Sequence, residues 1–197
     1  MTAPPSAPKP VASPAQSAAD RFTTCLAFTW QTDNDGQSYH VTPGDHGGPT
    51  AWGVTLAAFQ AWRVGQHKPA PTAADLRTTS KSELSTLIRA NYWNSVQADH
   101  LPLGVDLLVY DFGFGSGPGT SVTQLQRVLV GMGCSLVLDG QLGPMTLAAA
   151  AKVNRHDLAG HLGERHAAFY QSLQQFNLFG RGWLRRNTER VKLALLA

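Results

Sequence analysis

Glutamate, cysteine and long apolar runs are all scarce in this chain of 197 residues. No stretch of 18 or more apolar residues occurs, so we expect no transmembrane segment. The N-terminus lacks the basic and then apolar order of a secretory signal, and no signal peptide is expected. The only two cysteines, Cys25 and Cys134, are too few and too far apart for a disulfide framework or a zinc knuckle. Both are expected to be small core residues.

The charge of the chain is mild and unevenly distributed. A net charge of +3 is weak support for nucleic-acid binding, so no nucleic-acid partner is expected. From Arg155 onward, however, seven Lys or Arg face three acids. This basic part is compatible with contact to an anionic polymer, and equally with an ordinary solvated face.

The pattern along the chain predicts a leader followed by helices. Residues 1–19 are rich in Pro and Ala and have no apolar period, which indicates a disordered leader or tether. The remainder divides into a region at 20–90 and a second at 91–197. Helices are expected from Asp20, after Thr55, after Ser80 in a capping box with Glu83, at 105–112, from 122, from Pro144, at 157–176 and after Asn187 or Thr188, with a hinge-like loop at 113–119.

A polar, Gly-rich insertion near the front carries three acids in a chain that has only thirteen. Asp33, Asp35 and Asp45 lie close together in sequence, and two carboxylates across a cleft are what glycoside hydrolysis requires. Gly47 and Gly48 would let the backbone approach a ligand, and Thr50 would orient a water. The alternative interpretation is a simple turn cluster, since Asp, Asn and Gly are common in loops. A zinc peptidase or amidase with scattered histidine ligands is a weaker alternative.

Several motifs resemble glycoside hydrolase family 108, a family of phage and bacterial N-acetylmuramidases. The front of the chain resembles its Asp-Pro-Gly-Gly-x-Thr-x-x-Gly-Ile-Thr signature, and the second half is similar to the peptidoglycan-binding domain that follows. The matching pieces are Asp45-His46-Gly47-Gly48-x-Thr50-x-x-Gly53-Val54-Thr55, Asn91-Tyr92-Trp93, Leu101-Pro102-x-Gly104-Val105-Asp106, Tyr110-Asp111-Phe112, Ser116-Gly117-Pro118-Gly119, Leu125-Gln126, Asp139-Gly140-x-x-Gly143-Pro144-x-Thr146 and Gly180-Arg181-Gly182-Trp183-Leu184-x-Arg186.

The resemblance implies a fold and an activity. The expected fold is mainly α (α+β): a lysozyme-like helical domain with a small β-hairpin near 36–55, packed on C-terminal helices. The implied activity is cleavage of the β-1,4 bond between N-acetylmuramic acid and N-acetylglucosamine, without a metal or cofactor. Asp45 and Thr50 match the family positions that resemble the second acid and the water-orienting threonine of phage-type lysozymes.

One departure concerns the catalytic acid. Family members carry Glu-Gly-Gly-Tyr, and Tyr39 matches its tyrosine. An ungapped count places Gly36 at the glutamate, a count from the preceding helix places Asp33 there, and Asp35 is a third candidate. An aspartate acid is therefore one hypothesis. A catalytically impaired peptidoglycan-binding or regulatory protein of the same fold is the other.

The remaining expectations concern the substrate and the setting. Tyr39, Trp52, Tyr92 and Trp93 are candidate sugar-stacking rings, with Gly47 and Gly48 beside them, although aromatic residues are more often core. The expected partner is the peptidoglycan glycan strand, bound by a monomer. The resemblance further implies a protein that waits in the cytoplasm for a holin before it reaches the cell wall, or one that is carried on a phage-like particle.

Overall fold

The computed structural model describes residues 18–32, 38–42 and 47–197. This part of the chain is mostly helical and contains one small antiparallel sheet in the order β1-β2-β3, which confirms the predicted fold class. In chain order the elements are α1 (Ala18–Thr32), β1 (Tyr39–His40), β2 (Thr50–Ala51), β3 (Val54–Thr55), α2 (Leu56–Gly65), α3 (Ala73–Thr78), α4 (Lys81–Ile88), the π-helical turn η2 (Arg89–Trp93), the 3-10 turn η3 (Ala98–His100), α5 (Val105–Ser116), α6 (Pro118–Gly131), α7 (Pro144–Lys152), α8 (Arg155–Gln171) and α9 (Phe176–Leu196).

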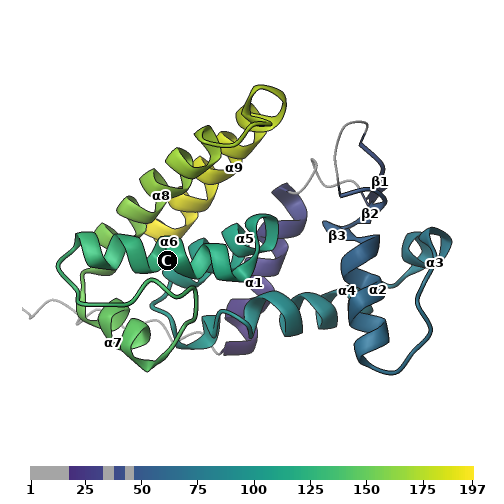
Figure 1. Ribbon diagram of the computed structural model, residues 1–197, viewed down its shortest axis with the longest axis horizontal. Helices are drawn as coiled ribbons and strands as arrows, with labels where there is room; N and C mark the ends of the chain where they lie inside the picture. The colour runs from purple at the N-terminus through teal and green to yellow at the C-terminus, as the bar shows by residue number, and fades with distance from the viewer. Residues whose placement is uncertain (1–17, 33–37, 43–46) are drawn as a thin grey trace, which may run out of the picture.

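Helix α5 lies at the centre of the molecule. In Figure 1 the sheet and α2–α4 lie on one side of α1, and α5–α9 lie on the other. α5 contacts α1, α6, α8 and α9, and every residue from Val105 to Gly113 is buried. Because one buried helix contacts both α1 and the last two helices, the C-terminal helices pack directly on the front of the chain, as predicted.

Three helices begin where the sequence indicates. The Thr55 hydroxyl accepts a hydrogen bond from the Ala58 amide at the start of α2, and the Ser80 hydroxyl accepts one from the Glu83 amide at the start of α4. Pro144 is the first residue of α7. The Glu83 carboxylate does not act as a cap, because it forms an ion pair of 3.0 Å with Arg63 on α2. The sequence therefore predicts the two capping hydroxyls correctly. It does not predict that Glu83 pairs with Arg63.

The predicted hinge-like loop at 113–119 is wrong. α5 continues to Ser116 and α6 begins at Pro118, so Gly117, with φ of +87°, is the whole joint between them. A Cβ on Gly113 would lie 3.2 Å from the Ser121 Cβ, which shows how closely α5 and α6 approach. The glycines serve helix packing here, and this tertiary contact outweighs their low helix propensity.

Several predicted helix ends also need correction. α9 runs without a break through Asn187 and Thr188, so neither residue is a cap. Asn187 is buried in the helix, where its amide donates to the Gly163 carbonyl oxygen at 2.9 Å. This tertiary hydrogen bond satisfies a side chain that would otherwise favour a helix start. α8 is capped by Asn154 and spans Arg155–Gln171, and α1 begins at Ala18, before Asp20.

The turn before α5 packs against the last turns of α9 and yields a stability prediction. Gly104 has φ of +86°, and a Cβ there would overlap the carbonyl oxygen of Ala194. We expect Gly104→Ala to lower the free energy of unfolding by about 2–4 kcal/mol, from left-handed strain and overpacking together. Urea denaturation measures this loss. Gly133→Ala is the control, because its φ is +91° but no atom lies within 4 Å of the added Cβ. Equal losses in the two variants would contradict the packing argument.

Candidate active site

The three predicted acids of the insertion, Asp33, Asp35 and Asp45, lie outside the described residues. The last described residue before Asp33 is Thr32, in the last turn of α1. The Thr32 hydroxyl donates to the Phe28 carbonyl oxygen at 2.8 Å. The described part of the candidate site consists of the sheet that follows and the helices around it.

Thr50 occupies a fixed position in the central strand. It pairs with His40 of β1 and Thr55 of β3, and its side chain is almost fully buried. Its hydroxyl donates to the Gly48 carbonyl oxygen at 3.0 Å. Because the hydroxyl proton is used in this bond, the oxygen lone pairs remain to accept a hydrogen bond from a water or a substrate hydroxyl. Gly48 has φ of +65°, and among the described residues no atom lies within 4 Å of a Cβ added there, which suits a close approach of backbone and ligand.

An aromatic and cationic cluster adjoins Thr50. Trp52, with φ of +48°, turns the chain between β2 and β3, and its ring lies 6.0 Å from that of Trp30 on α1. The ammonium of Lys81, the first residue of α4, lies 3.5 Å from the Trp52 ring centroid and 5.0 Å from that of Trp30. A positive φ on a bulky residue is strained, and such strain is concentrated at functional sites. Cation–π attraction holds the three elements together at this point.

Of the two predicted stacking rings of the insertion, Tyr39 lies in β1 of the same sheet as Thr50, and Trp52 lies in the turn between β2 and β3. The Trp52 amide donates to the Ser38 carbonyl oxygen at 3.2 Å, and the guanidinium of Arg77 lies 5.2 Å from the Tyr39 ring centroid. Both rings thus have a cation on one face. Neither Arg77 nor Lys81 could be found from the sequence, because a cation–π partner follows no short spacing.

Tyr92 and Trp93 lie in a different environment. Tyr92 packs against Phe114 of α5 with ring centroids 5.0 Å apart, and burial raises the pKa of its hydroxyl. Trp93 has no exposed surface, and its indole nitrogen donates to the Asp99 carboxylate at 2.8 Å. Trp93 is therefore part of the core and offers no face for a sugar in this conformation.

A buried polar network joins α1 to the C-terminal helices. Asp111 of α5 accepts a hydrogen bond from the Thr29 hydroxyl at 2.7 Å. Its two carboxylate oxygens also pair with Arg186 at 2.7 Å and Arg190 at 2.9 Å, both on α9. Burial opposes ionisation of Asp111, but the two guanidiniums outweigh it and hold the pKa of this carboxyl at about 2. This network fixes the last turns of α1 and was not foreseen from the sequence.

His166 of α8 adjoins this network through Arg190. Its ring stacks on Phe112 at 3.8 Å, and its Nδ1 lies 3.4 Å from a guanidinium nitrogen of Arg190. Burial and the charge of Arg190 hold the pKa of His166 well below its usual value of 6.5.

Cys25, also buried, has a thiol whose pKa is raised by burial, in agreement with its predicted core role. Cys134 is half-buried, and both cysteines are free.

The neutral state of His166 makes stability depend on pH. Between the depressed folded pKa and 6.5, the unfolded chain binds a proton that the folded chain does not. Stability is therefore complete above pH 6.5 and falls on acidification, by up to about 1.4 kcal/mol per pH unit from this group. Urea denaturation at pH 7.5, 6.0 and 5.0 checks this, with His166→Gln expected to show a shallower fall. An identical slope in the variant would contradict the assignment.

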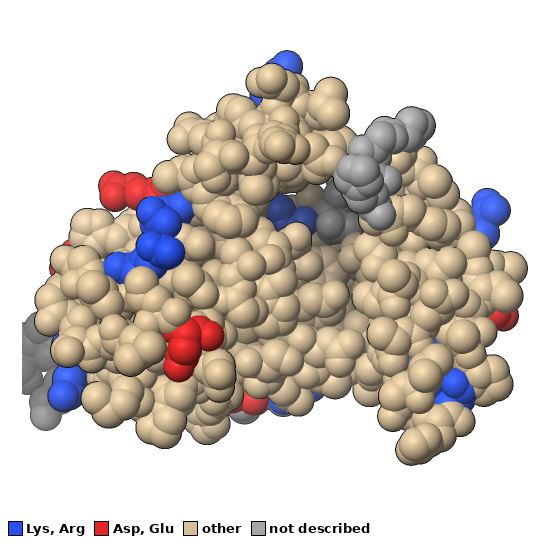
Figure 2. Space-filling model, viewed as in Figure 1, with Lys and Arg blue, Asp and Glu red and all other residues tan. Residues whose placement is uncertain are grey.

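The surface around the site is hollowed. Figure 2 shows a recess between the part of the molecule that carries the sheet and the end of α8 and α9, with Lys and Arg atoms visible inside it. Among the described residues, no three His, Cys, Asp or Glu side chains come close enough to hold a metal ion. None of the helices formed by these residues combines the length and the apolar character needed to cross a membrane.

Comparison with known proteins identifies the class of this chain. Residues 29–117 match the family model described as Glycosyl hydrolase 108, and residues 120–188 match the model described as Predicted Peptidoglycan domain. The chain is also similar to a solved structure, SagA of Brucella abortus, at 32% identity and a TM-score of 0.78, over 89% of this chain and 94% of that one. No curated protein matches it.

The chain belongs to the glycosyl hydrolase 108 family. The two matches follow one another in the predicted order, and together they define a peptidoglycan hydrolase family with peptidoglycan as partner. The family resemblance seen in the motifs is thereby confirmed. The predicted division of the chain at residue 90 stays a prediction, as do the roles of the individual site residues.

Proposed function

We propose that this protein is an N-acetylmuramidase that cleaves the β-1,4 bond between N-acetylmuramic acid and N-acetylglucosamine. Asp33 or Asp35 replaces the family glutamate as the proton donor, and Asp45 acts with Thr50 on the opposite side of the bond. The observation that supports this most is Thr50 itself, which is buried in the central strand with its hydroxyl held by the Gly48 carbonyl oxygen. A threonine fixed in this way presents a constant acceptor to an attacking water.

The proposed reaction needs only side chains of this chain. The acid transfers its proton to the leaving glycosidic oxygen as the bond breaks, and positive charge develops on the sugar ring. Asp45 removes a proton from the water that Thr50 orients, and the water attacks the opposite face of the ring. If the two carboxyl groups stand about 6.5–9.5 Å apart, the reaction inverts the anomeric centre.

The second candidate function is glycan binding without cleavage. It is favoured by the positions of the three glutamates of the chain. Glu83 is paired with Arg63, the Glu164 side chain is 81% exposed on α8, and Glu189 is exposed on α9. None of the three belongs to the insertion that carries the family acid. A chain without that acid would keep the fold and bind the polymer.

Two assays on the same protein separate the candidates. Purified Gram-negative sacculi are incubated with the wild type, and turbidity loss and co-sedimentation are measured in parallel. A muramidase lowers the turbidity, whereas a binding protein sediments with sacculi that stay intact. Co-sedimentation without any turbidity loss would overturn the proposed enzyme.

For the route to the wall, we propose release from the cytoplasm through a holin or carriage on a phage-like particle. This follows from the family resemblance alone. Lysis of cells that express the protein with a holin, but not without one, would support the first route.

A further inference from the structure

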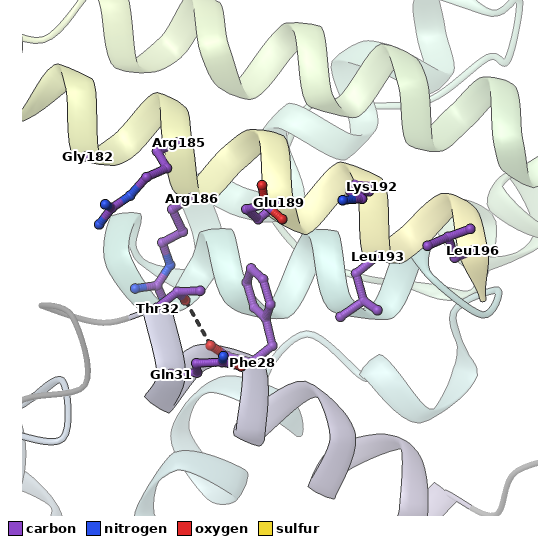
Figure 3. A pocket seen from close by; sticks show the side chains of 10 residues that line it. All are labelled: Phe28, Gln31, Thr32, Gly182, Arg185, Arg186, Glu189, Lys192, Leu193 and Leu196. Carbon is purple, nitrogen blue, oxygen red and sulfur yellow. Dashed lines mark hydrogen bonds between the residues drawn. The ribbon is translucent and has the colours of Figure 1, made fainter.

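A groove of about 420 Å³ runs between α1 and α9, within the size range of ligand sites. Figure 3 shows that one wall comes from the last turns of α1 and the other from a single face of α9. Arg185 and Arg186 lie toward the Thr32 end, and Leu196 lies at the opposite end. The lining residues are Phe28, Gln31, Thr32, Gly182, Arg185, Arg186, Glu189, Lys192, Leu193 and Leu196.

The charge of this groove favours an anion. Among the described residues that line the groove, Arg185, Arg186 and Lys192 contribute three positive charges, and Glu189 is the one acid. Beneath the groove, Asp111 forms ion pairs with both Arg186 and Arg190. Among the described residues that line or underlie the groove, positive charges exceed negative ones by two, beside the apolar surface of Phe28 and Leu193. A ligand that suits it has carboxylates near one end and alkyl groups near the other.

The position of the groove relates it to the substrate. Thr32 lines it and directly precedes Asp33, the first candidate acid, in the sequence. Gln31 and Thr32 of its α1 wall lie within the match to the hydrolase family, and α9 carries the end of the match to the peptidoglycan domain. A glycan strand held for cleavage near the end of α1 would therefore project its substituents toward this groove.

We infer that the groove between α1 and α9 is a subsite for the acidic stem peptide of peptidoglycan. The peptide is attached to the muramic acid of the strand and carries free carboxylates on alkyl side chains, which matches the cationic and apolar lining. This inference rests on the proposed function, because it takes peptidoglycan as the polymer that the site cleaves. It makes Arg185 and Lys192 specificity-determining residues and leaves the chemistry to the insertion.

The first test is direct binding of a soluble probe. The tripeptide L-alanyl-γ-D-glutamyl-meso-diaminopimelate is titrated into the full chain by calorimetry. Arg185→Gln with Lys192→Gln is expected to weaken binding about tenfold, as for two lost charge contacts. Glu189→Gln is expected to tighten it severalfold, because it removes the one acid of the lining. Arg127→Gln with Lys152→Gln is the matched control, since both residues are exposed and neither lines the groove. It should change binding less than twofold.

The second test compares two polymers. Intact peptidoglycan and glycan strands stripped of peptide by an amidase are each digested by the same variants. The Arg185→Gln, Lys192→Gln variant should lose rate on the intact polymer and keep it on the stripped one. If the wild type cleaves neither polymer, the proposed function fails while the titration still tests the groove.

Three results would overturn the inference. One is the absence of tripeptide binding by the wild type. Another is an equal loss of affinity in the control, which would indicate only a general charge effect. The third is loss of cleavage on both polymers in Glu189→Gln, which would make Glu189 part of the chemistry. Thermal unfolding verifies that each variant folds, and the Glu189→Gln titration stands by itself if the double variant does not.

Discussion

Asp111→Ala is expected to lower the free energy of unfolding by about 3–5 kcal/mol, a large share of the stability of a domain. The variant leaves Arg186 and Arg190 without the carboxylate that both contact, and the Arg190 side chain is fully buried. The cost arises mainly from these unpaired positive charges in a region of low dielectric. Chemical denaturation at pH 7 measures it.

The control for this variant is Asp157→Ala, at an exposed residue in the first turn of α8. It loses only a favourable interaction with the helix dipole, about 0.3–1 kcal/mol. The wild type adds a check by pH. Since the pKa of Asp111 falls from 3.8 to about 2 on folding, its contribution is complete above 3.8 and is lost as the pH falls through 2. An Asp111→Ala protein as stable as Asp157→Ala would refute the role of the network.

The second large effect concerns the proposed acid. Of Asp33→Asn and Asp35→Asn, one is expected to reduce the rate of peptidoglycan cleavage at least about a hundredfold, because an amide cannot donate the proton. The other should change the rate little. Turbidity loss of purified sacculi gives both rates under identical conditions.

Restoring the family residue at the same position sharpens the test. Aspartate reaches one methylene less far than glutamate, and a misplacement near 1 Å can cost about a hundredfold in rate. At the position that matters, Asp→Glu should therefore keep or raise the rate, while the same change at the other position should not. Full activity in both Asn variants would exclude an aspartate acid at either place.

Local signals in the sequence predicted much of the fold. The hydroxyls of Thr55 and Ser80 cap helices by bonding to amides three residues ahead, which a spacing rule detects. The buried run of α5 followed from its apolar composition. The hinge at 113–119 and the cap at Asn187 failed because contacts between helices decide those positions, namely the contact of Gly113 with Ser121 between α5 and α6 and that of Asn187 with Gly163 on α8.

In the candidate site, too, some residues could be predicted from the sequence and others depend on tertiary contacts. Thr50 followed from a motif and lies in the central strand, whereas Trp52 was selected as an aromatic residue and lies in the turn between β2 and β3. Trp93 was selected because it is aromatic, and an aromatic type alone does not separate a sugar platform from a core residue. The Asp111 network was not predictable, because Arg186 and Arg190 lie 75 and 79 residues away along the chain. Only the packing of α9 on α5 brings these charges together.

The measurement that tests the account most directly is the identity of the new ends in digested peptidoglycan. Purified sacculi are digested with wild-type protein, the products are reduced with borohydride, and the muropeptides are identified by mass spectrometry. The account predicts reduced muramic acid ends that are lost in one of the two variants, Asp33→Asn or Asp35→Asn. Reduced N-acetylglucosamine ends, cleaved amide bonds, or sacculi that bind the folded protein and stay intact would contradict it.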